Sequence, residues 1–318
     1  MNCNLIDQLC FENNINPFYG NIIVNKLTNQ KIITSFNREE SKKDIKIYTV
    51  ADIPDFLNVL LKEKNDDLKV KKIPQYKGYL IDLTKFKNAE DLFFQTLSRN
   101  PRKNFRSKKR KLESAHDISY SFHYGEIEKD YYDYLFEICY KLMEERFHEK
   151  KIYNRNLTKW KYYHDLFYPL ILDKKASIFV ISDQEKPITI TLNFHVSDIV
   201  FSHIQIYDLD YSRYSMGDIA IFKNIEWCYR NDFNIWDFSK GATDNKLRWS
   251  NHVYQFNYNL FYDHKSLFSI ATAELIKIKL TFKQFLRDKG IIGGMFQLDR
   301  LYYYTKMKKL KNYNWKNN

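Results

Sequence analysis

The segment YDLDYSRYSMGDIAIFKNIEW, residues 207–227, decides the fold of this chain. It begins at the end of an apolar run, 199–208, passes through a polar loop and continues from Gly217 into a pattern typical of a helix. A second short apolar run, 234–238, follows after a brief turn. Strand, helix and strand in this order predict a crossover that joins two parallel strands.

Three strands are predicted to lead into this crossover, at 176–182, 188–195 and 199–208. The turns between them are short enough for antiparallel hairpins. A three-residue loop is expected to pair His195 with Ile199, which would place two rows of polar residues on one sheet face. We interpret this face as facing a substrate, with an ordinary solvated face as the alternative. The predicted members of this face are Thr191, Asn193, His203, Gln205 and Tyr207.

The start of the helix at Gly217 is a predicted anion site. Free backbone N–H groups and the positive end of the helix dipole point there, and a nearby arginine adds a cation. The segment lacks the glycine spacing of the dinucleotide and P-loop motifs. The residues expected to contribute are Arg213, Ser215, Met216, Gly217 and Asp218.

Asp237 is a carboxylate inside a short apolar strand, where burial is costly unless the group is paired. Lys246 and Arg248 follow on the next segment. We expect Asp237 to pair with Lys246 and so to orient that segment, with proton transfer as the alternative.

Composition limits the class of protein. The chain has 318 residues, 44% of them hydrophobic, and a formal net charge of +12, which favours anionic partners. Its four cysteines show no metal-binding spacing and are expected to be reduced, mostly buried thiols. No apolar run reaches the ~20 residues of a membrane span, and the first residues do not resemble a signal peptide. A cytoplasmic protein is expected.

Metal chemistry is not expected, because the eight histidines are scattered and HEKK, 148–151, lacks the second histidine of a zinc-binding helix.

Three units are predicted along the chain: an α+β unit at 1–113, a catalytic unit at 114–265 and a basic helical extension at 266–318. The first unit is expected to alternate strands with one helix at 55–62, which follows a proline. The extension carries an apolar stripe, for which core packing is favoured over binding at a membrane surface. The stripe consists of Leu275, Ile278, Phe282 and Phe285.

The segment RNPRKNFRSKKRKLE, 99–113, has eight basic residues between Arg99 and Lys111. It is predicted to be a helix. A solvated linker helix and an anion-binding surface are both compatible with this pattern. An acidic acyl carrier protein and nucleic acid are the macromolecular partners that such a surface would suit.

The stretch from Ser177 to about Val253 resembles the CelD-like acetyltransferase family of the GNAT (acyl-CoA N-acyltransferase) superfamily. The matching features are YDLDYSRYSMGDI, the helix after it and WDFSKGATDNKLRW, while RKNFRSKKRKLE resembles that family's arginine-rich helix. The similarity covers roughly residues 90–262. It implies an α+β GNAT fold, which is a mixed sheet with flanking helices. It also implies a degenerate GNAT-like N-terminal half and a helical C-terminal extension.

The resemblance further implies transfer of an acyl group from a thioester to an amine, often on a sugar or a cell-envelope precursor. The thioester arm would lie where strands 199–208 and 234–238 splay apart, with the CoA pyrophosphate at the start of helix 217–230. In place of the superfamily's usual glycine-rich loop, this chain has RYSMGD at 213–218, and Asp218 would repel a pyrophosphate. The donor therefore stays open among acetyl-CoA, another acyl-CoA, an acyl carrier protein and, as in distant FemAB-like relatives, an aminoacyl-tRNA.

The amine must lose a proton before it attacks, so a base is needed. His203 and Asp208 are the first candidates and Asp237 the third, while Tyr207 is a candidate proton donor to the departing thiolate. Thr191, Asn193, Gln205, Lys246 and Arg248 are candidates for binding substrate. The main rival interpretation is a nucleic-acid-binding protein without enzymatic activity, which the charge and the basic segment favour.

Overall fold

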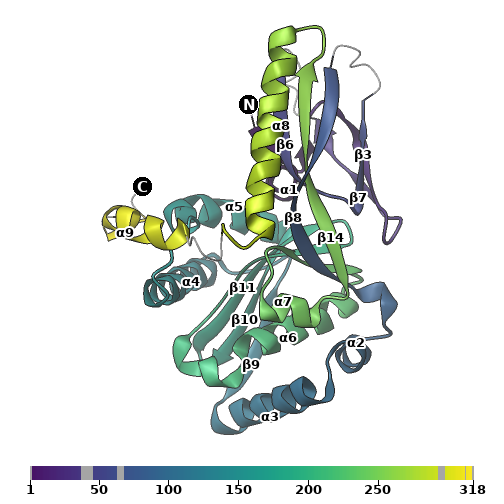
Figure 1. Cartoon of the computed structure of the whole chain (residues 1–318). Coiled ribbons are helices and arrows are strands. Elements are labelled where there is room, and N and C mark those ends of the chain that lie inside the picture. Colours follow the sequence, from purple (N-terminus) through teal and green to yellow (C-terminus); the bar gives the residue numbers. More distant parts are fainter. Residues whose placement is uncertain (1, 37–45, 63–67, 293–297, 312, 317–318) are drawn as a thin grey trace.

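The computed structural model of the chain describes residues 2–36, 46–62, 68–292, 298–311 and 313–316. Among these residues, nine strands form one mixed sheet (Figure 1). In spatial order they are β1 (Asn2–Asn4), β6 (Ile47–Pro54), β14 (His252–Asp263), β8 (Leu68–Asp82), β13 (Ile235–Lys240), β12 (Ile199–Tyr207), β11 (Lys186–Val196), β10 (Ala176–Asp183) and β9 (Ile118–His123). The β1–β6 and β12–β13 pairs are parallel, and the other neighbours are antiparallel.

The remaining strands form two small sheets near the N-terminus. They are β3 (Tyr19–Asn25), β4 (Lys31–Ile33) and β7 (Leu57–Leu61) in one, and β2 (Asn14–Ile15) and β5 (Ser35–Phe36) in the other. The α-helices are α1 (Leu5–Asp7), α2 (Ala89–Thr96), α3 (Arg99–Ala115), α4 (Lys129–Glu149), α5 (Trp160–Leu172), α6 (Met216–Arg230), α7 (Asp244–Trp249), α8 (Leu267–Asp288) and α9 (Leu298–Lys311). Shorter helical turns are η1 (Gln8–Glu12), η3 (Leu83–Lys85), η4 (Leu157–Lys159) and η5 (Leu209–Tyr214).

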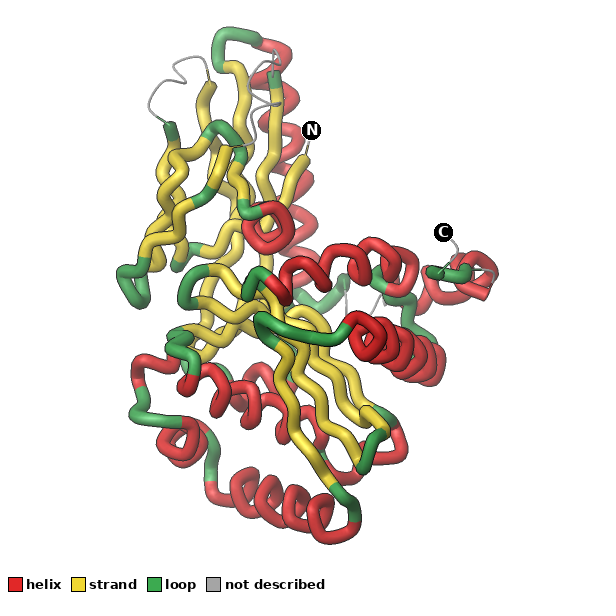
Figure 2. Tube along the Cα trace, turned by 180° about the vertical axis from the view of Figure 1, so that it is seen from behind, coloured by secondary structure: helices red, strands yellow, loops and turns green. Residues whose placement is uncertain are grey.

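Helices cover both faces of the sheet around β10, β11 and β12 (Figures 1 and 2). The helices α4 and α5 pack on one face, and α6 packs on the other, with α2 and α3 outside it. In β11, Ile190 and Leu192 join the core beneath α4 and α5, whereas Asn193 bonds to Asn224 of α6. Because both faces are covered, almost every residue of β11 is buried.

Strands β12 and β13 part soon after they begin. They pair in parallel only where residues 199–201 face residues 235–237, which confirms the expected crossover. Asp198, just before β12, connects the starts of β12 and β13. Its carbonyl oxygen accepts hydrogen bonds from the backbone N–H groups of Asn234 and Ile235, with N···O distances of 2.9 and 3.1 Å. Beyond this point β13 pairs with β8 on its other side. A gap therefore opens between the strands toward their carboxyl ends.

The predicted hairpin register before β12 is wrong. The loop has two residues, Ser197 and Asp198, and a β-bulge follows at His203. The bulge turns the His203 ring toward α5, where its centroid lies 5.0 Å from that of Tyr163, whereas Gln205 stays on the α6 side. The polar residues expected on one shared face are therefore divided between both faces of the sheet.

Two predictions for the N-terminal part are corrected. Residues 57–61 form strand β7 against β3 rather than part of a helix. Residues 68–82 form one long strand, β8, whereas the sequence pattern predicts two short strands at 68–73 and 78–83.

The prediction that the apolar stripe of α8 packs in a core is wrong, because its side chains are exposed. In the described part of the chain, no helix is both long enough and apolar enough to span a bilayer.

Candidate active site

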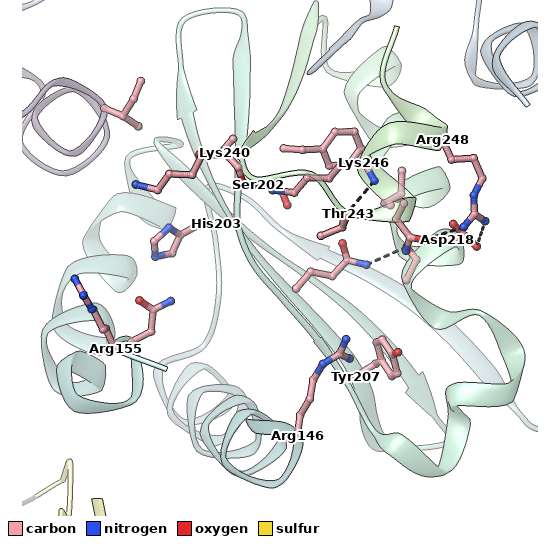
Figure 3. A pocket seen from close by; sticks show the side chains of 18 of the residues that line it. Arg146, Arg155, Ser202, His203, Tyr207, Asp218, Lys240, Thr243, Lys246 and Arg248 are labelled. Carbon is pink, nitrogen blue, oxygen red and sulfur yellow. Dashed lines mark hydrogen bonds and ion pairs between the residues drawn. The ribbon is translucent and has the colours of Figure 1, made fainter. Parts of the chain in front are cut away.

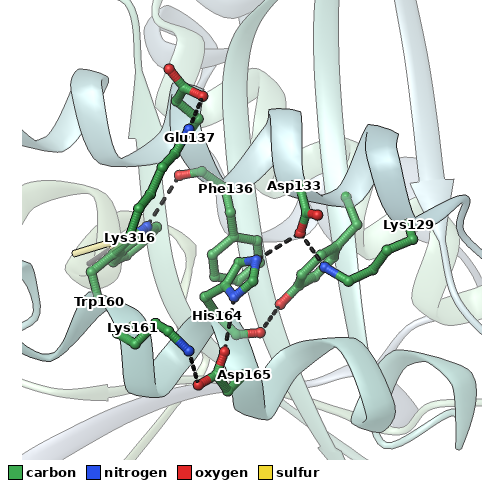
Figure 4. Close-up of polar contacts among 10 residues, drawn as sticks. Lys129, Asp133, Phe136, Glu137, Trp160, Lys161, His164, Asp165 and Lys316 are labelled. Carbon is green, nitrogen blue, oxygen red and sulfur yellow. Dashed lines mark hydrogen bonds and ion pairs between the residues drawn. The ribbon is translucent and has the colours of Figure 1, made fainter. Parts of the chain in front are cut away.

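A cavity of about 950 Å³ lies where β12 and β13 part (Figure 3). Its walls come from β12, α3 and the starts of α6 and α7 on one side and from α4, η4 and the N-terminal segment on the other. Among the described residues, seven cations and three carboxylates line it. The cations are Lys108, Arg146, Arg155, Lys159, Lys240, Lys246 and Arg248, and the carboxylates are Asp7, Asp52 and Asp218. This excess of positive charge makes the cavity attractive to anions.

The first turn of α6 forms one end of the cavity. Ser215 has a left-handed φ of 58° and turns the chain from η5 into α6, whose first N–H groups have no partner within the helix. Lys108 of α3 donates to Ser215 Oγ at 3.0 Å, so an ammonium group lies at the same turn. A Cβ on Gly217 would lie 3.1 Å from Asn245 Nδ2, so glycine keeps this opening clear.

Asp218 also lies in this turn, but its charge is paired. Its carboxylate accepts Arg248 Nη1 at 3.1 Å and Trp249 Nε1 at 2.9 Å. Both partners belong to α7, a short helix that the sequence did not reveal. The predicted repulsion between Asp218 and a bound anion is therefore offset by Arg248.

Asp237 is fully buried where the gap begins. Its two carboxylate oxygens accept the Tyr254 hydroxyl at 2.9 and 2.7 Å, and one also accepts the Ser239 N–H at 2.6 Å. Burial raises the pKa of Asp237 to about 7, although these hydrogen bonds act in the opposite direction. A Cβ on Gly78 would lie 2.2 Å from the Tyr254 ring, so the tyrosine reaches Asp237 by crossing β8 over a glycine.

Lys246 does not take the direct role predicted for it beside Asp237. Its Nζ donates to the carbonyl oxygen of Lys240 at 2.7 Å, and it acts on Asp237 through charge attraction alone. Burial lowers the pKa of Lys246 to about 8. Within the described chain, the hydrogen-bond partners of Asp237 are thus Tyr254 and Ser239.

His203 lines the cavity on its α5 side. Its ring lies 5.0 Å from the Tyr163 ring and 5.1 Å from the Phe194 ring, between centroids. Burial lowers the pKa of His203 to about 4, so the imidazole is neutral at pH 7. Its Nε2 has no hydrogen-bond partner among the residues that the structure describes.

Tyr207 and Arg146 form another part of the lining (Figure 3). The guanidinium carbon of Arg146 lies 4.4 Å from the centre of the Tyr207 ring. Buried in this position, Arg146 Nη1 has no hydrogen-bond partner in the described part of the chain. An unsatisfied guanidinium nitrogen is a strong donor for an anionic oxygen.

Thr191 and Asn193 lie beneath α6, outside the cavity lining. Asn193 Nδ2 donates to Asn224 Oδ1 at 3.1 Å and to Ser177 Oγ at 3.3 Å. Both predicted residues are fully buried.

Four further predicted residues also lie outside the lining, and one of them is the buried Asp237 described above. Asp208 caps η5 and pairs with Lys186 Nζ at 2.7 Å. Arg213 stacks on the Tyr214 ring, and Met216 is buried in the core. Of the predicted anion-binding residues, the structure brings Ser215, Gly217 and Asp218 to the cavity, together with Gln205, Lys246 and Arg248.

Sequence reasoning missed a polar cluster that the N-terminal segment contributes. Asp52 is buried and accepts Asn4 Nδ2 at 2.6 Å and Lys240 Nζ at 3.1 Å, and the Tyr76 hydroxyl donates to the same carboxylate. No local pattern marks Asp52, because its partners come from residues far away in the chain.

Three residues of the lining have left-handed backbone conformations. They are Asp52, Ser215 and Ser239, with φ values of 55°, 58° and 61°. Such conformations are costly for residues other than glycine and concentrate at functional sites. Together with the unsatisfied polar atoms, they make this cavity the candidate active site.

Residues 99–247 match the family model described as "Acetyltransferase (GNAT) domain". This part of the chain is a GNAT domain. Strands β9 to β13 of the mixed sheet, the helices α3 to α6 and the splay between β12 and β13 lie within that domain, as the resemblance implied. The match covers just under half of the chain, and no curated protein matches the chain significantly.

Solved structures show weaker similarity. FemX is 9% identical, with 73% of this chain and 74% of that chain covered and a TM-score of 0.49. L-PGS from Bacillus licheniformis is 10% identical, with 74% of this chain and 73% of that chain covered and a TM-score of 0.40. A tandem GNAT protein from the clavulanic acid biosynthesis pathway is 8% identical, with 68% of this chain and 64% of that chain covered and a TM-score of 0.37.

In the described residues, no group of three or more His, Cys, Asp or Glu side chains is arranged to hold a metal ion.

Proposed function

We propose that this chain is an N-acyltransferase that moves an acyl group from a thioester to an amine. The observation that carries the proposal is the gap between β12 and β13, which opens into a cationic cavity at the first turn of α6. A strand edge without a partner provides backbone N–H groups for an extended donor and for the oxyanion. The helix start and Lys108 provide positive charge for its phosphates.

The proposed donor is acetyl-CoA or another acyl-CoA, with its thioester in the gap. Lys108 and Asn104 of α3 line the cavity, while Lys103, Arg110 and Lys111 of the same helix are exposed. This outward basic surface suits a donor carried by an acidic macromolecule, such as an acyl carrier protein or, as the second candidate, an aminoacyl-tRNA. Because Arg248 pairs with Asp218, the carboxylate no longer argues against a phosphorylated donor.

For the chemical step, we propose that the neutral amine attacks the thioester carbonyl carbon. A C–N bond forms, the C–S bond breaks, and the thiolate leaves with a proton supplied by Tyr207. His203 takes the proton that the amine loses, because its unprotonated imidazole lines the cavity, although the burial that lowers its pKa to about 4 also makes it a weaker base than free imidazole. Asp208 forms an ion pair with Lys186, and Asp237 accepts hydrogen bonds from Tyr254 and Ser239. We therefore propose a structural role for both carboxylates in place of the role of base.

The acceptor is proposed to be an amine on an amino sugar, a peptide or a cell-envelope precursor. Membership of the CelD-like family and a degenerate GNAT-like N-terminal half are part of the same proposal. We also propose a cytoplasmic location, which suits the four free cysteines. A nucleic-acid-binding protein without activity is the rival function that the exposed cations of α3 favour.

The test is a binding experiment with acetyl-CoA, longer acyl-CoAs and an acylated carrier protein, monitored by calorimetry and thermal shift. We expect one donor class to bind the unmodified protein and to lose affinity for Gly217→Glu, which places a carboxylate and bulk at the helix start. Gly20→Glu is the matched control, because a Cβ there meets only the Leu60 carbonyl oxygen at 3.8 Å.

If no thioester binds and tRNA binds with strong salt dependence, the acyl-CoA proposal is wrong. Transfer of an aminoacyl group from charged tRNA would then support the second candidate. Binding to uncharged nucleic acid without transfer would support the rival function.

A further inference from the structure

Helix α8 has two apolar faces, and only one of them is packed. Its inner face places Ala273 against Ile73 of β8 and Leu260 of β14. Its outer face carries six large apolar side chains that are 50% to 84% exposed. These are Leu267, Phe268, Leu275, Ile278, Phe282 and Phe285. A continuous exposed apolar patch of this kind marks an interaction surface.

The spacing of the outer residues identifies the kind of surface. Phe268, Ala271, Leu275, Ile278, Phe282 and Phe285 follow one another in steps of three and four residues in alternation. We call these six residues the α8 seam. Alternating steps of three and four place them at the a and d positions of a heptad, the pattern of a helix that packs against another helix.

The charged residues beside the seam indicate the orientation of the second helix. With Phe268 at position a, Glu274 occupies position g and Lys279 occupies position e of the following heptad. In a parallel pair, g faces e of the next heptad, so Glu274, whose carboxylate also pairs with Lys71 of its own β8, lies opposite Lys279 of the other copy. An antiparallel pair sets g beside g and e beside e, which brings like charges together.

We propose that this chain forms a parallel, two-fold symmetric homodimer through the α8 seam. A two-fold axis along the seam lets the same surface complement itself. The inner face of α8 stays on β8 and β14, which Figure 1 shows beside it, so the outer face alone takes part in the pairing. The pairing removes the side chains of the α8 seam from water, and the two Glu274–Lys279 contacts favour the parallel direction.

The mass of the full chain in solution tests the dimer, measured by light scattering after size exclusion. We expect twice 38.6 kDa for the unmodified protein and 38.6 kDa for Leu275→Glu/Phe282→Glu. The matched control is Leu301→Glu on α9, where an exposed leucine receives the same change away from the seam. Circular dichroism and thermal melting verify that each variant is folded.

A monomeric unmodified protein would overturn the proposal, as would a dimer that survives the double substitution. A monomer that binds phosphatidylglycerol vesicles, and loses this binding in the double variant, would assign the seam to a lipid surface instead.

Orientation is tested with Leu275→Cys, because an a residue faces its own copy only in a parallel pair. Oxidation should yield a covalent dimer, whereas Leu301→Cys should not. A dimer without this cross-link would overturn the parallel arrangement.

Discussion

Burial of the Asp237 carboxylate costs stability, but its hydrogen bonds position the cavity wall. A fully buried carboxylate loses its hydration, which raises its pKa, and the group is retained because a tyrosine and a backbone N–H replace the lost water. Those bonds hold Ser239 in a left-handed conformation at the cavity wall. We therefore assign Asp237 a positioning role in the proposed enzyme.

The raised pKa of Asp237 makes a prediction about stability. The pKa of Asp237 is 3.8 in its ordinary state and about 7 in the folded protein. At a pH between these two pKa values, the folded state keeps a proton that the unfolded state releases. Stability from this group is therefore present at low pH and falls as the pH rises through this window, by on the order of 4 kcal/mol. Asp237→Asn has no proton to lose. Urea unfolding should show the variant gaining stability relative to the unmodified protein between about pH 5 and about pH 7.5.

Asp173→Asn is the control, since the Asp173 side chain is 61% exposed. A stability difference between Asp237→Asn and the unmodified protein that is the same at both pH values would contradict the assigned pKa.

The proposed base makes a second prediction at this scale. His203→Gln should lower kcat by about 100- to 10,000-fold, because proton transfer by a positioned group contributes roughly that much. Donor affinity should change little, since the proposed donor site lies at the α6 turn. Steady-state kinetics and donor titration together separate the two effects. Asp208→Asn is the comparison, and a larger loss of kcat there than in His203→Gln would transfer the role to Asp208.

Among the elements, β8 depends on one glycine. Because Tyr254 crosses the strand at Gly78, a methyl group at Gly78 would collide with a buried ring whose hydroxyl is tied to Asp237. Gly78→Ala should therefore destabilise the fold by roughly 1–3 kcal/mol, the usual cost of overpacking a core. Denaturant unfolding measures this, with Gly20→Ala as the control at an open position. Equal stability of Gly78→Ala and the unmodified protein would show that the tyrosine can move aside.

Elements whose pattern is local were predicted well, and those fixed by distant partners were not. The alternation in 188–195 and the helical spacing after Gly217 both led to correct elements, because the spacing of apolar residues along a strand or a helix is a local signal. Residues 57–61 follow Pro54 and read as a helix, but pairing with β3 makes them a strand. The bulge at His203 has no sequence signature, so the faces of β12 could not be assigned correctly.

At the scale of the whole molecule, the cavity is assembled from residues far apart in the chain. Its lining runs from Asn4 to Phe256 and includes Arg146 and Lys240. Of the residues predicted at the α6 turn, Ser215, Gly217 and Asp218 reached the cavity, whereas Arg213 and Met216 lie outside its lining. Asp52 and Arg146 were missed, since each becomes a site residue only where other segments meet it.

The sequence by itself determined the strand–helix–strand crossover and the GNAT-like character of the part of the chain around it, where residues 99–247 match the family model. These features depend on periodicity, glycine placement and charge, which are properties of neighbouring residues. Only the tertiary structure decided that Asp237 is held by Tyr254, that Asp218 is held by Arg248 and that the α8 stripe is exposed. Each of these depends on whether a distant segment contacts the side chain, and such contacts are decided only when the whole chain packs.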